Sequence, residues 1–285
     1  MQSDSGSFLD TLLFTFPLWL VGLVLVAACL LALQAGKLLH IRASRRGTET
    51  PDAGKSDADG YIIAAIFALL AFLTGLTFSI ALDRFDTRRG LVAEEANAIS
   101  TAYLRASLFD EPHRAQLQTL LHTYARSRIA PEGLWNKQMD AKVENARALR
   151  DRLWDATHAA VYPVRETELA SYFVEAMNET LNVGIRRELA GRAHVPTRIL
   201  NILLLYLVAA SVVLGYLVAE ESRGRRQAAM ILVALFAVSM LLILDIDRPH
   251  SGTVNVPQRA LEELIAMLDR DAARRNAAPI TRTPR

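Results

Sequence analysis

Residues 61–109 read YIIAAIFALLAFLTGLTFSIALDRFDTRRGLVAEEANAISTAYLRASLF, and this stretch decides the fold. Its first part, residues 61–82, contains no charged residue and has the length of roughly 20 residues with which a helix crosses a membrane. Beyond Leu82 only Gly90 weakens a helix, and one glycine costs about 1 kcal/mol. We therefore predict one continuous helix that starts in a membrane and extends well into water.

Three further apolar blocks cover residues 18–39, 199–219 and 228–244. The chain is 52% hydrophobic with a mean hydropathy of +0.19, and its charged residues, 22% of the total, are almost absent from the blocks. The last block is short, so Arg225 and Arg226 are expected to extend towards the interface at its start. Buried core helices of a soluble protein are the alternative, but charge-free stretches of this length favour four membrane crossings.

Residues 83–198, between the second and third blocks, are rich in Ala, Leu, Glu and Arg, which favour helices. We predict an all-α integral membrane protein: four transmembrane helices with a helical extramembrane bundle inserted between the second and third. Asp110 is the expected cap of the first new helix of the bundle. The expected bundle helices cover residues 112–129, 135–160 and 166–190. Aromatic side chains expected in the core or at domain contacts are Trp135, Trp154 and Tyr172.

The remaining segments are connections and ends. They are expected to be a tail at 1–17, a flexible linker at 40–60, a hairpin at 220–227, a boundary segment with an amphipathic helix at 245–275, and a disordered tail at 276–285.

Several classes of function are disfavoured. The 32 basic and 30 acidic residues give a net charge of +2 with no basic stripe, so no nucleic-acid partner is expected. Residues 26–29 (VAAC) match a lipoprotein cleavage box, but no basic residue precedes them, and we expect Cys29 to be a membrane-facing packing residue. Since no nucleophile elbow, phosphate loop or zinc signature occurs, we predict no enzyme, no cofactor and no metal site.

The side of the membrane on which the bundle lies stays open. Basic residues in the two short loops, 40–60 and 220–227, lean towards a bundle on the outside. The ends of the bundle carry arginines of their own, however, and long domains count for little under this rule.

Two stretches carry a resemblance to a known family. Residues 82–105 (LDRFDTRRGLVAEEANAISTAYLR) follow one membrane helix, and residues 242–252 (LILDIDRPHSG) follow the last one. Together they resemble the bestrophin-like domain family of bacterial membrane proteins, most of which lack an assigned function. The family is distantly similar to the bestrophins, ion channels that assemble as homopentamers. The resemblance implies a homo-oligomer in the bacterial inner membrane that conducts inorganic ions, with the bundle in the cytoplasm.

The resemblance also implies where a pore would lie. In bestrophins the second membrane helix lines the pore, and apolar side chains four residues apart form a neck upstream of an arginine that Arg84 matches. The corresponding positions here are Ala68, Phe72 and Leu76, with the small Ala68 widening one ring. From the residues alone, the stripe Phe72, Leu76 and Ile80 could equally face lipid. Two more candidates, Thr74 and Thr77, could line a wet path or bond their own helix.

Polar residues on the extension of this helix form a second group of candidates: Glu94, Glu95 and Asn97. They could form a ring of carboxylates that attracts cations. Alternatively, they could belong to a network between helices with Arg88, Arg89 or Arg105.

Charged residues gather at both membrane boundaries, namely Asp83, Arg84, Asp86, Arg88, Asp245, Asp247 and Arg248. Such clusters are expected to fix helix register and depth. Bestrophins carry an acidic calcium clasp after the last membrane helix, but two carboxylates beside an arginine are too few for calcium. The predicted function is therefore a bestrophin-like ion channel of unassigned selectivity. The alternative is a non-conducting scaffold or signalling protein whose helical domain binds a partner protein.

Overall fold

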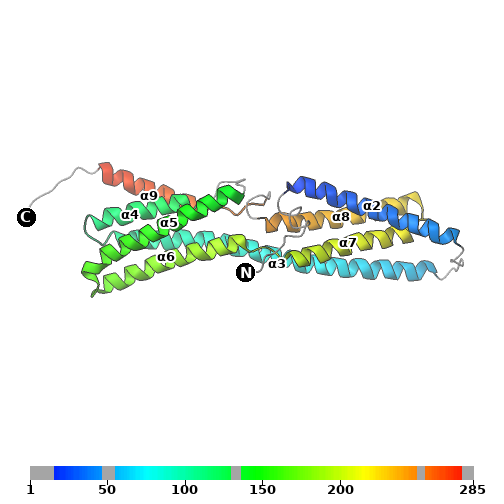
Figure 1. Ribbon diagram of the computed structural model, residues 1–285, viewed down its shortest axis with the longest axis horizontal. Helices are drawn as coiled ribbons and strands as arrows, with labels where there is room; N and C mark the ends of the chain where they lie inside the picture. The colour runs from blue at the N-terminus through cyan, green and yellow to red at the C-terminus, as the bar shows by residue number, and fades with distance from the viewer. Residues whose placement is uncertain (1–15, 47–54, 130–135, 249–253, 278–285) are drawn as a thin grey trace, which may run out of the picture. The chain divides into compact units, whose positions relative to one another are not determined.

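The computed structural model describes residues 16–46, 55–129, 136–248 and 254–277, and every regular element in these ranges is a helix (Figure 1). The elements are α2 (Leu18–Arg45), α3 (Lys55–Ala106), α4 (His113–Ser127), α5 (Asn136–Val161), the short 3-10 helix η1 (Tyr162–Val164), α6 (Glu168–Arg192), α7 (Thr197–Leu217), α8 (Arg223–Asp247) and α9 (Arg259–Ala277). The all-helical fold agrees with the prediction.

The chain divides into two compact units. The first comprises Met1–Arg84 with His194–Val254, and the second comprises Phe85–Ala193 with Asn255–Arg285. The helix α3 begins in the first unit and ends in the second. Its 52 residues form one helix through Gly90, as the sequence predicts.

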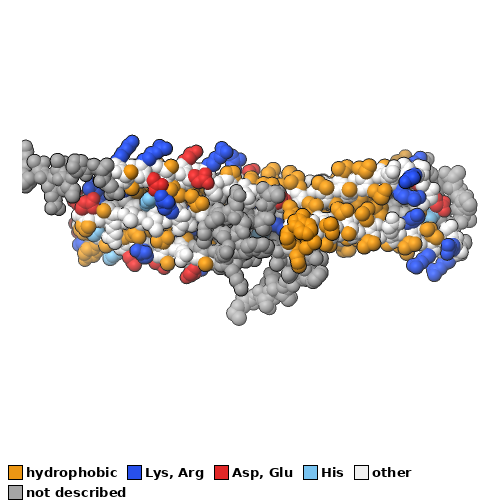
Figure 2. All heavy atoms as spheres, turned by 90° about the horizontal axis from the view of Figure 1, so that it is seen from above, with side chains coloured by type: hydrophobic (Ala, Val, Ile, Leu, Met, Phe, Trp, Pro, Cys, Tyr) orange, Lys and Arg blue, Asp and Glu red, His pale blue; other side chains and the backbone are white. Residues whose placement is uncertain are grey.

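Four stretches in the described part of the chain are long and apolar enough to cross a membrane: Leu18–Arg45, Gly60–Ala106, Glu168–Leu217 and Arg223–Asp247. Figure 2 shows that hydrophobic side chains cover the visible face of the first unit, whereas charged side chains gather on the second unit and at one end of the first. A surface of this kind is stable in lipid and not in water.

Two glycines allow α2 and α7 to approach each other closely in the first unit. A Cβ added to Gly36 would lie 2.0 Å from the carbonyl oxygen of Val212, and one added to Gly215 would lie 2.1 Å from that of Leu33. Small residues let backbones meet in this way, which is how membrane helices gain packing energy. Cys29 also lies on this inner side of α2 and is 1% exposed, so its predicted lipid-facing position is wrong.

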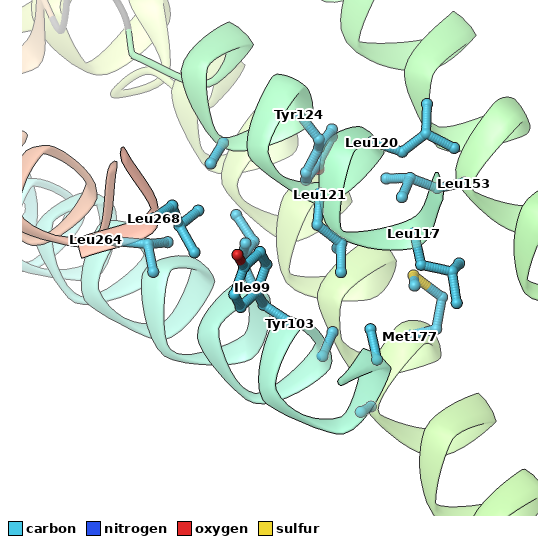
Figure 3. Packing of buried hydrophobic residues seen from close by; sticks show 14 of the residues in the cluster. Ile99, Tyr103, Leu117, Leu120, Leu121, Tyr124, Leu153, Met177, Leu264 and Leu268 are labelled. Atoms are coloured by element: carbon cyan, nitrogen blue, oxygen red, sulfur yellow. The ribbon is translucent and has the colours of Figure 1, made fainter. Parts of the chain in front are cut away.

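The core of the second unit is built by α3, α4, α5, α6 and α9 together (Figure 3). Ile99 of α3 and Leu121 of α4 are both fully buried, and Leu268 of α9 is 1% exposed. The apolar face of α9 thus covers the bundle, which explains why this helix is amphipathic.

One local prediction for the second unit is wrong, and the structure narrows another. Asp110 does not cap α4: the N-cap position is Pro112, and the Glu111 carboxylate accepts a hydrogen bond from the Ala115 N–H at 3.2 Å. Trp154 and Tyr172 are 44% and 53% exposed, so they are not core residues of the subunit, and a domain contact stays the prediction for both. Trp135, most of the predicted N-terminal tail and most of the C-terminal tail lie outside the described residues.

The glycine contact between α2 and α7 can be tested by substitution. Because the atom facing Gly36 belongs to the backbone, we expect Gly36→Ala to force the helices apart and lower the free energy of unfolding by about 1–3 kcal/mol. Gly75→Ala is the matched control, since nothing lies within 4 Å of its added Cβ. It should leave stability unchanged or raise it by up to about 1 kcal/mol. Thermal unfolding in detergent measures both, and equal shifts would contradict the close contact.

Candidate functional site

The apolar stripe predicted on α3 faces out of the single subunit. Phe72 is 65% exposed and Leu76 is 52% exposed, Ala68 is also exposed, and Ile80 is half-buried. The opposite face of the same segment packs inside the first unit through buried residues at helical spacing, namely Phe67, Leu70, Thr77 and Ala81. The stripe is therefore free to contact lipid or another molecule.

The two threonines are not part of this stripe. Thr77 is 3% exposed, and its Oγ1 donates to the carbonyl oxygen of Leu73 at 2.8 Å. Thr74 is half-buried. The structure thus favours the own-helix bonding that was left open for Thr77.

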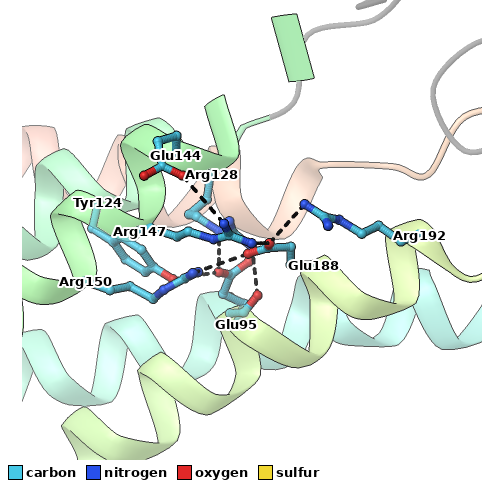
Figure 4. A network of polar contacts seen from close by, with 9 residues as sticks. Glu95, Tyr124, Arg128, Glu144, Arg147, Arg150, Glu188 and Arg192 are labelled. Carbon is cyan, nitrogen blue, oxygen red and sulfur yellow. Dashed lines mark hydrogen bonds and ion pairs between the residues drawn. The ribbon is translucent and has the colours of Figure 1, made fainter. Parts of the chain in front are cut away.

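Glu95 lies at the centre of a buried ionic network in the second unit (Figure 4). Its side chain is 0% exposed, and its two carboxylate oxygens accept from Arg128 Nε and Arg187 Nη1, each at 2.6 Å. The Tyr124 hydroxyl donates to Oε1 at 3.3 Å, and burial raises the pKa of this phenol to about 12. The partners are therefore not Arg88, Arg89 or Arg105.

A glycine on α6 makes room for this network. A Cβ at Gly184 would lie 2.3 Å from the Tyr124 hydroxyl and 3.2 Å from Glu95 Oε1. The Gly184 carbonyl oxygen also accepts from Arg128 Nη2 at 3.1 Å. Arg128, Arg187 and Gly184 could not be predicted as partners of Glu95, since each lies far from it along the chain.

The neighbours of Glu95 have a different environment. The Glu94 side chain is 58% exposed and lies 3.4 Å from Arg186 Nη2, and Asn97 is exposed. The three predicted polar residues therefore divide into an exposed pair and one buried carboxylate.

A second carboxylate, that of Glu188, forms ion pairs with three arginines beside this network (Figure 4). Arg147 Nη2 lies 2.8 Å from Oε1, Arg192 Nη2 lies 3.4 Å from Oε1, and Arg150 Nη2 lies 3.3 Å from Oε2. Burial opposes ionisation of Glu188, but the hydrogen bonds from Arg147 and Arg150 outweigh it and lower the pKa of the carboxyl. Glu188 is hence an anion that three cations surround.

The boundary residues bind the ends of helices. In the second unit, Arg88 is 5% exposed and donates to the carbonyl oxygens of Ala190 and Ala193 at 3.2 and 2.6 Å. A cation there satisfies orphan carbonyls at the C-terminus of α6. Asp83 and Asp86 are exposed, and Arg84 is half-buried.

In the first unit, Asp247 at the end of α8 is fully buried and accepts from the Val195 N–H at 2.9 and 3.1 Å. Arg248 donates from Nη1 to the carbonyl oxygen of Phe16 at 2.9 Å, and Asp245 is 4% exposed. Among the described residues there is no group of three or more His, Cys, Asp or Glu side chains that could hold a metal ion.

Comparison with known proteins identifies the family. The sequence model of the bestrophin-like domain matches residues 24–261. The chain belongs to the bestrophin-like domain family. No curated protein matches the sequence of this bestrophin-like protein.

Solved structures of low sequence identity share the fold of the bestrophin-like chain. A single-substitution variant of a bacterial bestrophin homolog from Klebsiella pneumoniae has a TM-score of 0.62 at 14% identity, covering 90% of this chain and 98% of that one. A second structure of the homolog from the same organism has a TM-score of 0.56 at 15% identity, with 86% and 96% covered. A structure described only as a membrane protein has a TM-score of 0.61 at 13% identity, with 86% and 96% covered. The protein is thus a membrane protein with the bestrophin fold.

The buried network can be tested with adjacent residues. Glu95→Gln leaves two buried guanidinium groups without a counter-charge, which we expect to lower the free energy of unfolding by about 3–5 kcal/mol. Glu94→Gln removes an exposed partner and should cost about 0–1 kcal/mol. Denaturant unfolding monitored by circular dichroism in detergent compares the two variants. Equal losses would show that Glu95 is not the buried partner.

Proposed function

We propose that this protein is a homo-oligomeric ion channel of the bacterial inner membrane, with α3 lining the pore. The observation that carries the proposal is the outward face of α3. Family membership and the bestrophin fold support the class of function.

The membrane segment of α3 is the least covered of the four candidate spans. Within one subunit 17% of its most apolar window is buried, compared with 33%, 39% and 44% for the other three stretches. A membrane helix with so little cover in its own subunit has surface available for copies of the same chain. Packing of identical helices around an axis would cover it.

The exposed residues of α3 form one line along the helix. At about 100° per residue, Ala68, Leu76, Glu94 and Asn97 all point within about 40° of the direction of Phe72. All five residues are exposed. A single face of the helix therefore carries apolar side chains in its membrane part and polar ones in its extension.

This arrangement suits an ion path with two zones. Apolar side chains at Phe72 and Leu76 would form a constriction that gates by dewetting. Glu94 would raise the local concentration of cations beyond it, while Asn97 adds a neutral polar ring. We leave Glu95 and Thr77 out of this path, because both point about 140° away from Phe72 and are buried.

The proposal is tested by recording from purified protein in planar bilayers. We expect single-channel currents whose amplitude or open probability changes when Phe72 or Leu76 is replaced by alanine. Leu205→Ala is the control, since this apolar residue belongs to α7 and its side chain is 70% exposed. Silent bilayers under both cation and anion gradients would contradict the proposal.

Assembly separates the channel from its rival, a non-conducting scaffold that binds a partner protein. A closed ring with the α3 helices around the axis, seen by cryo-electron microscopy along the membrane normal, fits the channel. A monomer, or a dimer whose α3 stripes face lipid, fits the scaffold.

A further inference from the structure

Of the three arginines around Glu188, one is largely buried and two are accessible to solvent. The Arg150 side chain is 12% exposed and lies deep in the cluster. Arg147 and Arg192 are 48% and 57% exposed, so they form its outer side. Figure 4 shows the guanidinium groups of these two residues approaching Glu188 from different helices, α5 and α6.

Positive charge exceeds negative charge in this part of the second unit. Five guanidinium groups, those of Arg128, Arg147, Arg150, Arg187 and Arg192, share the carboxylates of Glu95 and Glu188. A third carboxylate, that of Glu144, lies 3.5 Å from Arg147 but is 76% exposed, so water screens it. The network therefore holds an uncompensated positive charge.

Arg150 adds a largely buried guanidinium group behind Arg147 and Arg192. Because water screens a buried charge less than an exposed one, Arg150 strengthens the electrostatic attraction for an incoming anion.

We propose that the outer side of this cluster, between Arg147 and Arg192, is a binding site for one phosphate-type oxyanion. Each of the two exposed guanidinium groups directs Nη2 to Glu188, and Arg147 also directs Nη1 to the exposed carboxylate of Glu144. The rest of each donor set would serve phosphate oxygens. Planar guanidinium forks match such oxygens in pairs, which gives charge-assisted hydrogen bonds. Arg150 contributes charge from behind, and Glu188 holds all three arginines in place.

The phosphate could belong to a free anion or to the headgroup of a lipid. Arg192 precedes the first residue of α7, Thr197, by only five positions. An extended chain of that length spans at most about 18 Å, so this end of the site lies within reach of the membrane boundary. The chemistry at the site is the same for both sources, and the experiment separates them. The site does not depend on ion conduction.

The test uses the full-length protein in detergent. Inorganic phosphate is titrated at constant ionic strength against chloride, and a short-chain phosphatidylglycerol is titrated against the corresponding phosphatidylcholine. Binding is followed by the shift of the thermal unfolding midpoint, and by broadening of the phosphorus NMR signal, which requires no variant. The wild type should respond to phosphate, to phosphatidylglycerol, or to both.

The variant for this test is Arg147→Gln with Arg192→Gln. We expect its apparent Kd to rise by about tenfold or more, because two charge-assisted contacts are lost. The control removes two other exposed arginines, Arg186→Gln with Arg165→Gln, and should bind as the wild type does. Their side chains are 50% and 57% exposed, which matches the pair under test.

A response to phosphate but not to the lipid assigns a free anion, and the reverse assigns a headgroup. The proposal is overturned if neither ligand shifts the wild type, or if the double variant and its control bind alike.

Discussion

The carboxylate of Glu95 has no access to water and lies between the guanidinium groups of Arg128 and Arg187, and the three side chains come from three separate parts of the chain. A buried charge of this kind is tolerated only while its partners stay in hydrogen-bonding distance. The second unit therefore has little freedom to shift α3 against α4 and α6. The same network requires a glycine at position 184, because the side chain of a larger residue would occupy the space of Tyr124 and Glu95.

The constraint gives α3 two different faces. One face supplies Ile99, Tyr103 and Glu95 to the interior of the second unit and Leu70 to that of the first. The other face is left uncovered along both parts of the helix. A helix anchored so firmly on one side presents the opposite side in a defined direction, which is what a contact between identical subunits requires.

The main features of the fold could be predicted from local sequence. The four apolar blocks, and the absence of any break stronger than Gly90 after Leu82, were enough to predict the spans and the long helix. The direction in which each side chain leaves that helix could also be predicted from residue spacing. Glu94 and Asn97 point near the direction of Phe72, whereas Glu95 does not. That signal alone separates the exposed pair from the buried carboxylate.

Contacts between distant parts of the chain could not be predicted. Arg128 and Arg187 lie 33 and 92 residues from Glu95, and no local pattern connects them. Cys29 lies in an apolar block, which is typical of a lipid-facing position. Its burial depends on how closely α7 packs against α2 at the glycine contact. The predicted cap of α4 was wrong by one residue, because the carboxylate that accepts from the Ala115 N–H belongs to Glu111.

Glu94 and Glu95 are consecutive, yet one faces water and the other is sealed in the bundle. This contrast makes the length of α3 as important as its composition. One residue added or removed between Arg88 and Glu95 would turn these two side chains by about 100° relative to each other within the second unit. Arg88 and Glu95 could then no longer reach their partners at the same time, although every side chain was still present. Insertions and deletions in this interval should therefore be tolerated far less than substitutions on its surface.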